Sequence, residues 1–175
     1  MTIILDFDDV LFDTKKFKLC LAKIFEKYKI DFRKYYNKAK EPRGAYSLKK
    51  HLFLVKKENR KIDIKKIEKD INKINFKAFL FSDTLNFLKK FKNHDLILLS
   101  WGEKKFQQTK IYGVGRNFVS LFDKVITGPE EKAKVLRRIL NLYKSKPIIF
   151  IDNNLQERKK IRDNFKDIKI CRQLF

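Results

Sequence analysis

The feature that most constrains this chain is a series of short apolar segments after residue 95, separated from one another by longer segments with helical spacing. The segments at 96–99 (LILL) and 148–151 (IIFI) contain no polar residue, which is typical of strands buried on both faces. Further helices and strands are expected in alternation at 104–112, 124–127, 130–143, 155–165 and 168–171. Strands and helices that alternate in this way predict a parallel sheet covered by helices on both faces.

One more strand precedes this series, and a long helical interruption follows it. Residues 2–7 (TIILDF) predict a strand, whereas residues 14–80 show helical spacing. Helices are expected at 14–29, 31–40, 46–57, 63–74 and 82–91, with Thr14 as the first N-cap and a turn at 42–44. We therefore predict a doubly wound α/β core of residues 1–13 and 81–175, with an all-helical cap of residues 14–80 over the carboxyl edge of the sheet.

The charge of the chain is strongly positive and is concentrated in the expected cap. The chain carries 43 Lys and Arg residues against 21 Asp and Glu residues, a net charge of +22. Residues 14–80 hold 22 of the basic and 7 of the acidic residues, a net charge of +15. Such a field attracts nucleic acid and other polyanions. The chain is also rich in Ile, Phe and Asn, and an AT-rich genome would produce the same bias, so both interpretations stay open.

The sequence predicts no membrane partner. The N-terminal apolar segment is short and acids follow it at once, which is unlike a secretory signal. The other apolar segments are far shorter than the roughly 18 residues that cross a bilayer. We expect a cytoplasmic protein. His51 and His94 have no metal-ligand spacing and are expected at the surface.

Polar side chains stand at the ends of three predicted strands. Asp6 and Asp8 follow the first strand, Ser100 ends the second, and Asp152 follows the segment at 148–151. Because a parallel sheet places these strand ends on one edge, we expect the side chains to converge there.

The segment DFDDVLFDT at 6–14, followed in order by Ser100, a lysine at a helix start and Asp152, resembles the haloacid dehalogenase superfamily. The resemblance covers nearly the whole chain and implies a phosphate monoester hydrolase. It implies that Asp6 is the nucleophile, forming an aspartyl-phosphate, and that Asp8 is the general acid and base. It also implies Mg²⁺ held by Asp6, by the main-chain carbonyl of Asp8 and by Asp152.

The same resemblance implies a phosphate site made by Ser100, by the amides of Trp101 and Gly102, and by one lysine. Lys132 and Lys134 are the candidates, since both stand early in the helix expected at 130–143. Lys132 shares its helix face with apolar residues, whereas Lys134 shares its face with polar ones. The face toward the sheet should carry the lysine that binds phosphate, so we choose Lys132.

The metal site departs from the family pattern, which often has a second acid in this region. Asp152 is followed by Asn153, which keeps an acceptor oxygen but carries no charge. Glu157, five residues after Asp152, is the candidate for a second acid that acts through a metal-bound water. Without it we expect weak magnesium binding.

Three functions follow from these observations. The interpretation that we favour is a magnesium-dependent phosphatase acting on a small phosphorylated metabolite. A phosphatase for nucleotides or nucleic-acid ends, and a non-catalytic nucleic-acid-binding protein with the same fold, are the alternatives that the positive charge supports. A dehalogenase is disfavoured, because displacing halide needs no acid at the position of Asp8, whereas a phosphomutase would use the same residues as a phosphatase.

Overall fold

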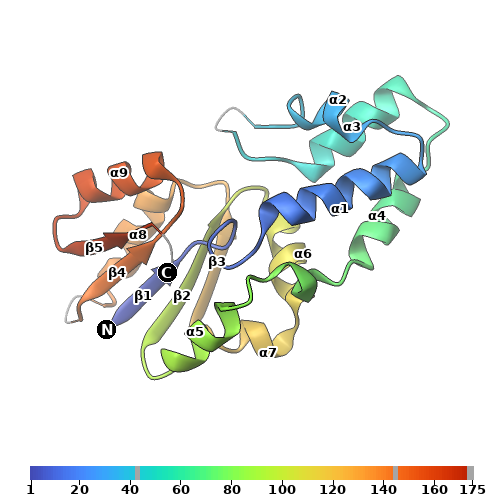
Figure 1. Cartoon of the computed structure of the whole chain (residues 1–175). Coiled ribbons are helices and arrows are strands. Elements are labelled where there is room, and N and C mark those ends of the chain that lie inside the picture. Colours follow the sequence, from blue (N-terminus) through green and yellow to red (C-terminus); the bar gives the residue numbers. More distant parts are fainter. Residues whose placement is uncertain (42–43, 144–145, 173–175) are drawn as a thin grey trace.

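A five-stranded parallel sheet forms the centre of the molecule (Figure 1). The computed structural model describes residues 1–41, 44–143 and 146–172. The strands are β1 (Thr2–Leu5), β2 (Asp95–Trp101), β3 (Lys124–Gly128), β4 (Ile148–Ile151) and β5 (Ile168–Cys171). They lie in the order β3-β2-β1-β4-β5, and every neighbouring pair is parallel. This order confirms the predicted doubly wound α/β fold.

Helices cover both faces of the sheet, because successive side chains of each strand point to opposite faces. The covering helices are α5 (Thr84–Lys90), α6 (Lys104–Val114) and α7 (Arg116–Val119) on one face, with α8 (Lys132–Leu140) and α9 (Leu155–Asn164) on the other. Ile3 and Leu5 belong to the hydrophobic cluster of the first face, whereas Ile4 packs in the cluster that contains α8 and α9. The fully apolar strand segments therefore serve two cores at once. Helix α7 was not predicted.

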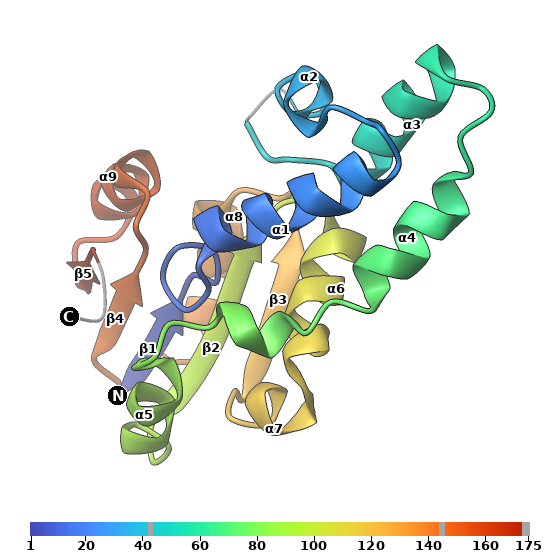
Figure 2. The same ribbon diagram turned by 45° about the vertical axis from the view of Figure 1, so that its right-hand side comes forward.

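The segment between β1 and α5 is helical and lies beyond the carboxyl ends of the strands (Figures 1 and 2). It consists of α1 (Thr14–Lys27), α2 (Phe32–Tyr36), α3 (Leu48–Glu58), α4 (Ile64–Asn72) and the 3₁₀ helix η1 (Phe76–Phe79). Helix α2 is shorter than expected, and η1 was not predicted. Part of the turn predicted at 42–44 lies outside the described residues. The division at residues 13 and 81 stays a prediction.

The two chain crossings between this helical segment and the sheet lie side by side. The Asp13 amide donates to the Phe79 carbonyl at 2.7 Å, and the Phe81 amide donates to the Leu11 carbonyl at 3.1 Å. Phe12 and Phe17 continue the core of the first sheet face into the helical segment, with ring centroids 5.3 Å apart. The helical segment is thus held over the sheet edge by hydrogen bonds and by a shared core. No helix within the described parts of the chain is long and apolar enough to cross a membrane.

The N-cap of α1 differs from the prediction. Asp13, not Thr14, caps the helix, because its carboxylate accepts a hydrogen bond from the Lys16 amide at 2.8 Å. The hydroxyl of Thr14 instead donates to the carboxylate of Asp8 at 3.0 Å. The first turn of α1 therefore contributes directly to the sheet edge.

His51 was expected at the surface, but it is fully buried within the helical segment. Its Nδ1 lies 2.9 Å from the hydroxyl of Tyr46, and its ring packs against Phe25 and Phe32. The other ring nitrogen, Nε2, has no hydrogen-bond partner among the described residues. Burial lowers the pKa of His51 to about 4, because a charged imidazole would lose its hydration.

We predict that His51 makes the fold sensitive to acid. The folded-state pKa of about 4 lies below the ordinary value of 6.5, so the folded state binds fewer protons than the unfolded state between these values. The free energy of unfolding should therefore fall as the pH drops from 6.5 to 4, by on the order of 3 kcal/mol from this residue. Urea unfolding of wild type and His51→Phe across this range measures it. An equally steep fall in the variant would contradict the assignment.

Candidate active site

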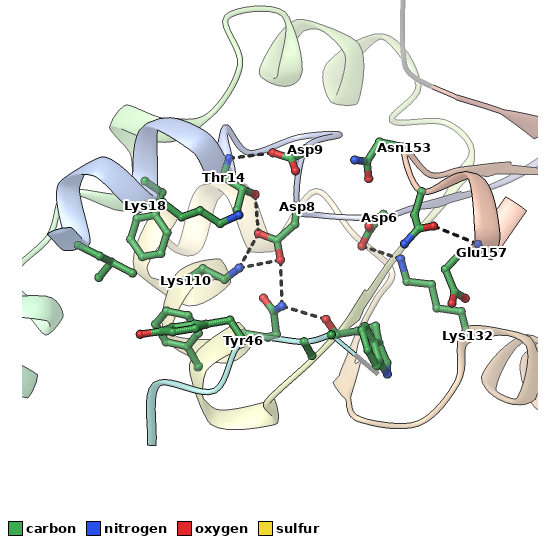
Figure 3. Close-up of a pocket in the computed structure, with 18 of the residues that line it drawn as sticks. Asp6, Asp8, Asp9, Thr14, Lys18, Tyr46, Lys110, Lys132, Asn153 and Glu157 are labelled. Atoms are coloured by element: carbon green, nitrogen blue, oxygen red, sulfur yellow. Dashed lines mark hydrogen bonds and ion pairs between the residues drawn. The ribbon is translucent and has the colours of Figure 1, made fainter. Parts of the chain in front are cut away.

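A cavity of about 280 Å³ opens at the carboxyl ends of β1 and β4. In the sheet, β2 and β3 follow β1 on one side, whereas β4 and β5 lie on its other side. The strand order therefore reverses between β1 and β4. Open α/β sheets bind ligands at such points. The charged and amide side chains that line the cavity include Asp6, Asp8, Lys132, Asn153 and Glu157 (Figure 3).

Lys132 joins two of the strand-end acids. Its ammonium lies 2.8 Å from Oδ1 of Asp6 and 2.7 Å from Oδ2 of Asp152, and its side chain is only 3% exposed. The Phe7 amide donates to the same Oδ1 of Asp6 at 2.8 Å. No donor among the described residues bonds the second oxygen of Asp6, Oδ2. Asp6 therefore presents one oxygen that is engaged and one that is open.

When both carboxylates are ionised, this group of three buried charges carries one negative charge in excess, since two carboxylates share one ammonium. Burial raises the pKa of Asp6 to about 7, and the attraction of Lys132 opposes this rise while the nearby charges of Asp152 and Asp8 add to it. For Lys132, burial favours the neutral amine, but the two carboxylates outweigh burial and raise its pKa. A further cation near Asp6 would therefore stabilise its ionised form.

Asp8 is held by three side chains, of which Lys110 and Gln107 were not predicted and Thr14 was expected only as an N-cap. Lys110 lies 2.5 Å from Oδ1 and 2.7 Å from Oδ2 of Asp8, Gln107 donates to Oδ2 at 2.9 Å, and Thr14 donates to Oδ1 at 3.0 Å. Burial would raise the pKa of Asp8, but the charge of Lys110 and these hydrogen bonds outweigh burial and lower it. Asp8 is therefore an ionised carboxylate with a fixed orientation.

The position of Lys110 in its helix is the signal that could have found it. Lys110 is buried, and it shares the inward face of α6 with Phe106, Ile111 and Val114. A lysine within an apolar helix face needs a buried acid as partner. The ammonium of Lys110 also lies 5.5 to 5.6 Å from the ring centroids of Phe7, Phe12 and Phe106.

Ser100 does not line this cavity but a neighbouring hollow, whose other lining residues include Trp101 and Lys132. Its side chain is 1% exposed and its hydroxyl has no hydrogen-bond partner among the described residues. Trp101 lines the cavity, and its indole N–H donates to the carbonyl of Pro129 at 2.9 Å.

The expectation for Gly102 needs correction. Its amide already donates to the carbonyl of Gly128 at 2.9 Å, so this N–H is not available to a phosphate. Gly102 has another use, because its φ of +147° suits glycine and a Cβ here would lie 2.8 Å from Nε2 of Gln107. The absence of a side chain at Gly102 thus leaves room for the amide that holds Asp8.

The residues expected to hold a metal are partly brought together. Within the described residues, no group of three or more His, Cys, Asp or Glu side chains is arranged to hold an ion. Asp152 is fully buried and does not line the cavity, and its oxygens accept from Lys132 and from the Asn154 amide. Asn153 and Glu157 do line the cavity, and Glu157 lies 3.7 Å from Lys160.

Magnesium nevertheless fits the open oxygens at the end of β1. Oδ2 of Asp6 and the main-chain carbonyl of Asp8 accept no hydrogen bond from the described residues, and the buried charges leave one negative charge in excess. Mg²⁺ is often held by one or two carboxylates together with waters and a substrate phosphate. The donor set is therefore suited to an ion that the substrate helps to hold, and it is poor for an ion held by protein alone.

Several solved structures have a fold similar to that of this chain. No family model and no curated protein matches the chain. Among solved structures, a protein from Burkholderia xenovorans LB400 described as a haloacid dehalogenase-like hydrolase is 18% identical, with a TM-score of 0.80 over 97% of this chain and 80% of that chain. A HAD-hydrolase described from Bacillus subtilis, bound to magnesium, is 13% identical, with a TM-score of 0.65 over 97% and 85%.

The L-2-haloacid dehalogenase of Xanthobacter autotrophicus is 11% identical to this chain, with a TM-score of 0.60 over 97% of this chain and 75% of that chain. The chain therefore has an α/β fold of the doubly wound class, with a polar site at its topological switch point. Within that class, it has the fold of the haloacid dehalogenase superfamily.

Proposed function

We propose that the chain is a magnesium-dependent phosphatase that hydrolyses a phosphate monoester through an aspartyl-phosphate on Asp6. The observation that carries this proposal is that Asp6 and Asp8 line one cavity but differ in how many of their carboxylate oxygens are bonded. Asp6 is open at Oδ2, whereas Asp8 is bonded at both oxygens.

The proposed reaction has two steps. Oδ2 of Asp6 attacks phosphorus, the bond from phosphorus to the ester oxygen breaks, and that oxygen takes a proton from Asp8. Asp8 then takes a proton from water, which attacks phosphorus and releases phosphate from Asp6. The contacts of Lys110 with Asp8 favour the ionised carboxylate, which the second step needs. The first step needs a protonated Asp8, and a phosphate ester that binds as its monoanion would bring that proton to the ionised carboxylate.

Bound Mg²⁺ would be held by Asp6 and the Asp8 carbonyl, with Asn153 and Glu157 close by, and would supply positive charge beside the transferring phosphate. Lys132 keeps Asp6 oriented through its contact with Oδ1. Ser100 does not line the cavity, so its hydroxyl would reach a phosphate oxygen only from the neighbouring hollow that it shares with Lys132. A buried hydroxyl without a partner costs about 1–3 kcal/mol, and such a bond would offset that cost.

We predict that activity needs added magnesium and disappears with a chelator. Asn153→Asp should tighten the apparent magnesium affinity, because it adds a carboxylate to the cavity that Asp6 lines. Glu157→Gln should weaken it if Glu157 acts through a bound water. Activity titrated with magnesium in the three proteins measures both effects. An unchanged titration in both variants would exclude these residues from the metal site.

The similarity to the X. autotrophicus enzyme raises dehalogenation as an alternative reaction. A halide leaves as a stable anion and needs no proton, whereas an alkoxide leaving group does. The acid at Asp8, with three side chains ordering it, therefore supports transfer of a phosphoryl group over displacement of a halide.

A small metabolite is the substrate class that the cavity supports. Its volume of about 280 Å³ lies near the lower end of the range for small-molecule cavities, about 300–1,000 Å³. Of the basic residues at 14–80, Lys18 alone lines the cavity within the described parts of the chain. A polyanion would need more bases there, so the nucleotide, nucleic-acid-end and nucleic-acid-binding readings are less well supported.

A screen for hydrolysis with magnesium tests the proposed function. We expect release of phosphate from small sugar and hydroxy-acid phosphates, with lower kcat/KM for phosphorylated oligonucleotides at low and moderate salt. A strong oligonucleotide preference that fades with salt would favour the nucleic-acid reading. Release of halide from haloacids, with no release of phosphate from any ester, would overturn the proposal.

A further inference from the structure

The cap wall of the cavity contains one lysine, Lys18, that forms no ion pair with any acid of the described residues. Lys110 is paired with Asp8, and Lys132 with Asp6 and Asp152. Lys18 also lines the cavity, but no carboxylate of the described residues lies within ion-pair distance of its ammonium. This difference separates Lys18 from the lysines that support the proposed chemistry.

The position of Lys18 in α1 directs it to the cavity. Thr14, Lys18 and Leu21 are spaced by four and three residues and all line the cavity, so they share the inward face of the helix. Thr14 at one end of this face bonds Asp8, and Leu21 is buried at the other end. A lysine held between them is not part of the solvated face of the helix.

A second cation strengthens the positive charge at this end of the cavity. The ammonium groups of Lys18 and Lys40 each lie 5.2 Å from the ring centroid of Tyr36, which lines the cavity. No ion pair with a described acid neutralises either lysine. Lys40 does not itself line the cavity, so it adds to the positive charge around the ring of Tyr36 without contacting a ligand in the cavity.

The order of the charged groups across the cavity indicates which part of the substrate would lie near Lys18. Figure 3 shows Asp6 and Lys132 on one side of Asp8, and Lys18 with Thr14 on the other. In the proposed reaction, phosphorus lies at Asp6 and the ester oxygen at Asp8. The remainder of the leaving group therefore extends from Asp8 toward Lys18.

We propose that Lys18, with Lys40 behind it, forms a subsite for a second anionic group on the substrate. The substrate would then be a phosphate monoester with a carboxylate or a second phosphate on a short carbon chain. The cavity of about 280 Å³ restricts the length of that chain. This inference rests on the proposed function, since it places the reacting phosphate at Asp6.

Three matched esters test the subsite. They are three-carbon phosphate monoesters that differ only in the distal group, which is a hydroxyl, a carboxylate or a second phosphate. The wild type should prefer the anionic esters by about 10- to 100-fold in kcat/KM, mainly through KM, because a contact between charged groups is lost with the hydroxyl. The better of the two anionic esters identifies the distal group.

Substitutions then assign the preference to Lys18. Lys18→Met should remove most of the preference, Lys18→Arg should keep it, and Lys40→Met should reduce it partly. Lys23→Met is the matched control, because Lys23 is exposed on the same helix and does not line the cavity. An equal preference in wild type and Lys18→Met, or no preference in wild type, would overturn the inference.

Binding to Asp6→Asn separates this inference from the proposed function. Calorimetry with the three esters measures selectivity in a protein that lacks the proposed nucleophile. Selective binding that Lys18→Met removes, with no hydrolysis by wild type, would support the subsite and contradict the proposed function. Hydrolysis without selectivity would contradict the subsite alone.

Discussion

Asp6→Asn should abolish turnover of every phosphate ester that the wild type hydrolyses. The amide that replaces the carboxylate has no nucleophilic oxygen of comparable strength, so the first step is lost. Lys132 would still be paired, because Asp152 lies 2.7 Å from its ammonium. The substitution should therefore remove activity without leaving a buried charge uncompensated. Steady-state release of phosphate measures the effect.

The stability of this variant provides the control. The folded-state pKa of Asp6 is raised to about 7 from 3.8, so the folded state binds more protons than the unfolded state between these values. In the absence of metal, the free energy of unfolding of the wild type should therefore fall as the pH rises from 4 to 7. Asp6→Asn should lack the part of this fall that the titration of Asp6 causes. The variant is expected to be at least as stable as wild type at pH 7. Near-normal turnover in a folded Asp6→Asn would exclude Asp6 as the nucleophile.

Asp8→Asn should slow turnover by about 10²–10⁴-fold, the usual contribution of a general acid or base. The same substitution leaves the ammonium of Lys110, 4% exposed, without its carboxylate. Removing one partner of a buried ion pair costs about 3 kcal/mol or more, so the variant should also be destabilised. Activity and thermal unfolding must be measured together for this reason.

The double substitution Asp8→Asn with Lys110→Met separates the two effects. Removing both charges should restore much of the stability, because the unpaired ammonium is gone, whereas turnover should stay low. Recovery of activity together with stability would show that Asp8 supports the fold and not the chemistry.

The sequence predicted the sheet well, for a physical reason. Strands buried on both faces must be apolar at every position, so LILL at 96–99 and IIFI at 148–151 leave little choice of structure. The approach of Asp6, Asp152 and Lys132 to one another follows from their places at strand and helix ends. Their catalytic roles stay predictions.

The contacts that helix α6 makes with Asp8 were not predicted, because they depend on how the helix packs against the sheet. Gln107 and Lys110 are brought to Asp8 by the packing of α6 on the sheet, and no strand-end rule points to them. His51 was misplaced because a lone histidine gives no sign of burial, and only the aromatic residues around it in three dimensions decide its position. The amide of Gly102 was misassigned because its bond to Gly128 depends on the end of a neighbouring strand.

Phosphoryl transfer to Asp6 is tested most directly by acid quench of the wild type during turnover of a phosphate ester, followed by mass spectrometry of its peptides. We predict a phosphorylated peptide that contains Asp6, formed with wild type and magnesium and missing with Asp6→Asn. An unmodified Asp6 peptide at every quench time, in an enzyme that is releasing phosphate and whose intermediate survives the quench in a matched aspartyl-phosphate standard, would contradict the proposed mechanism.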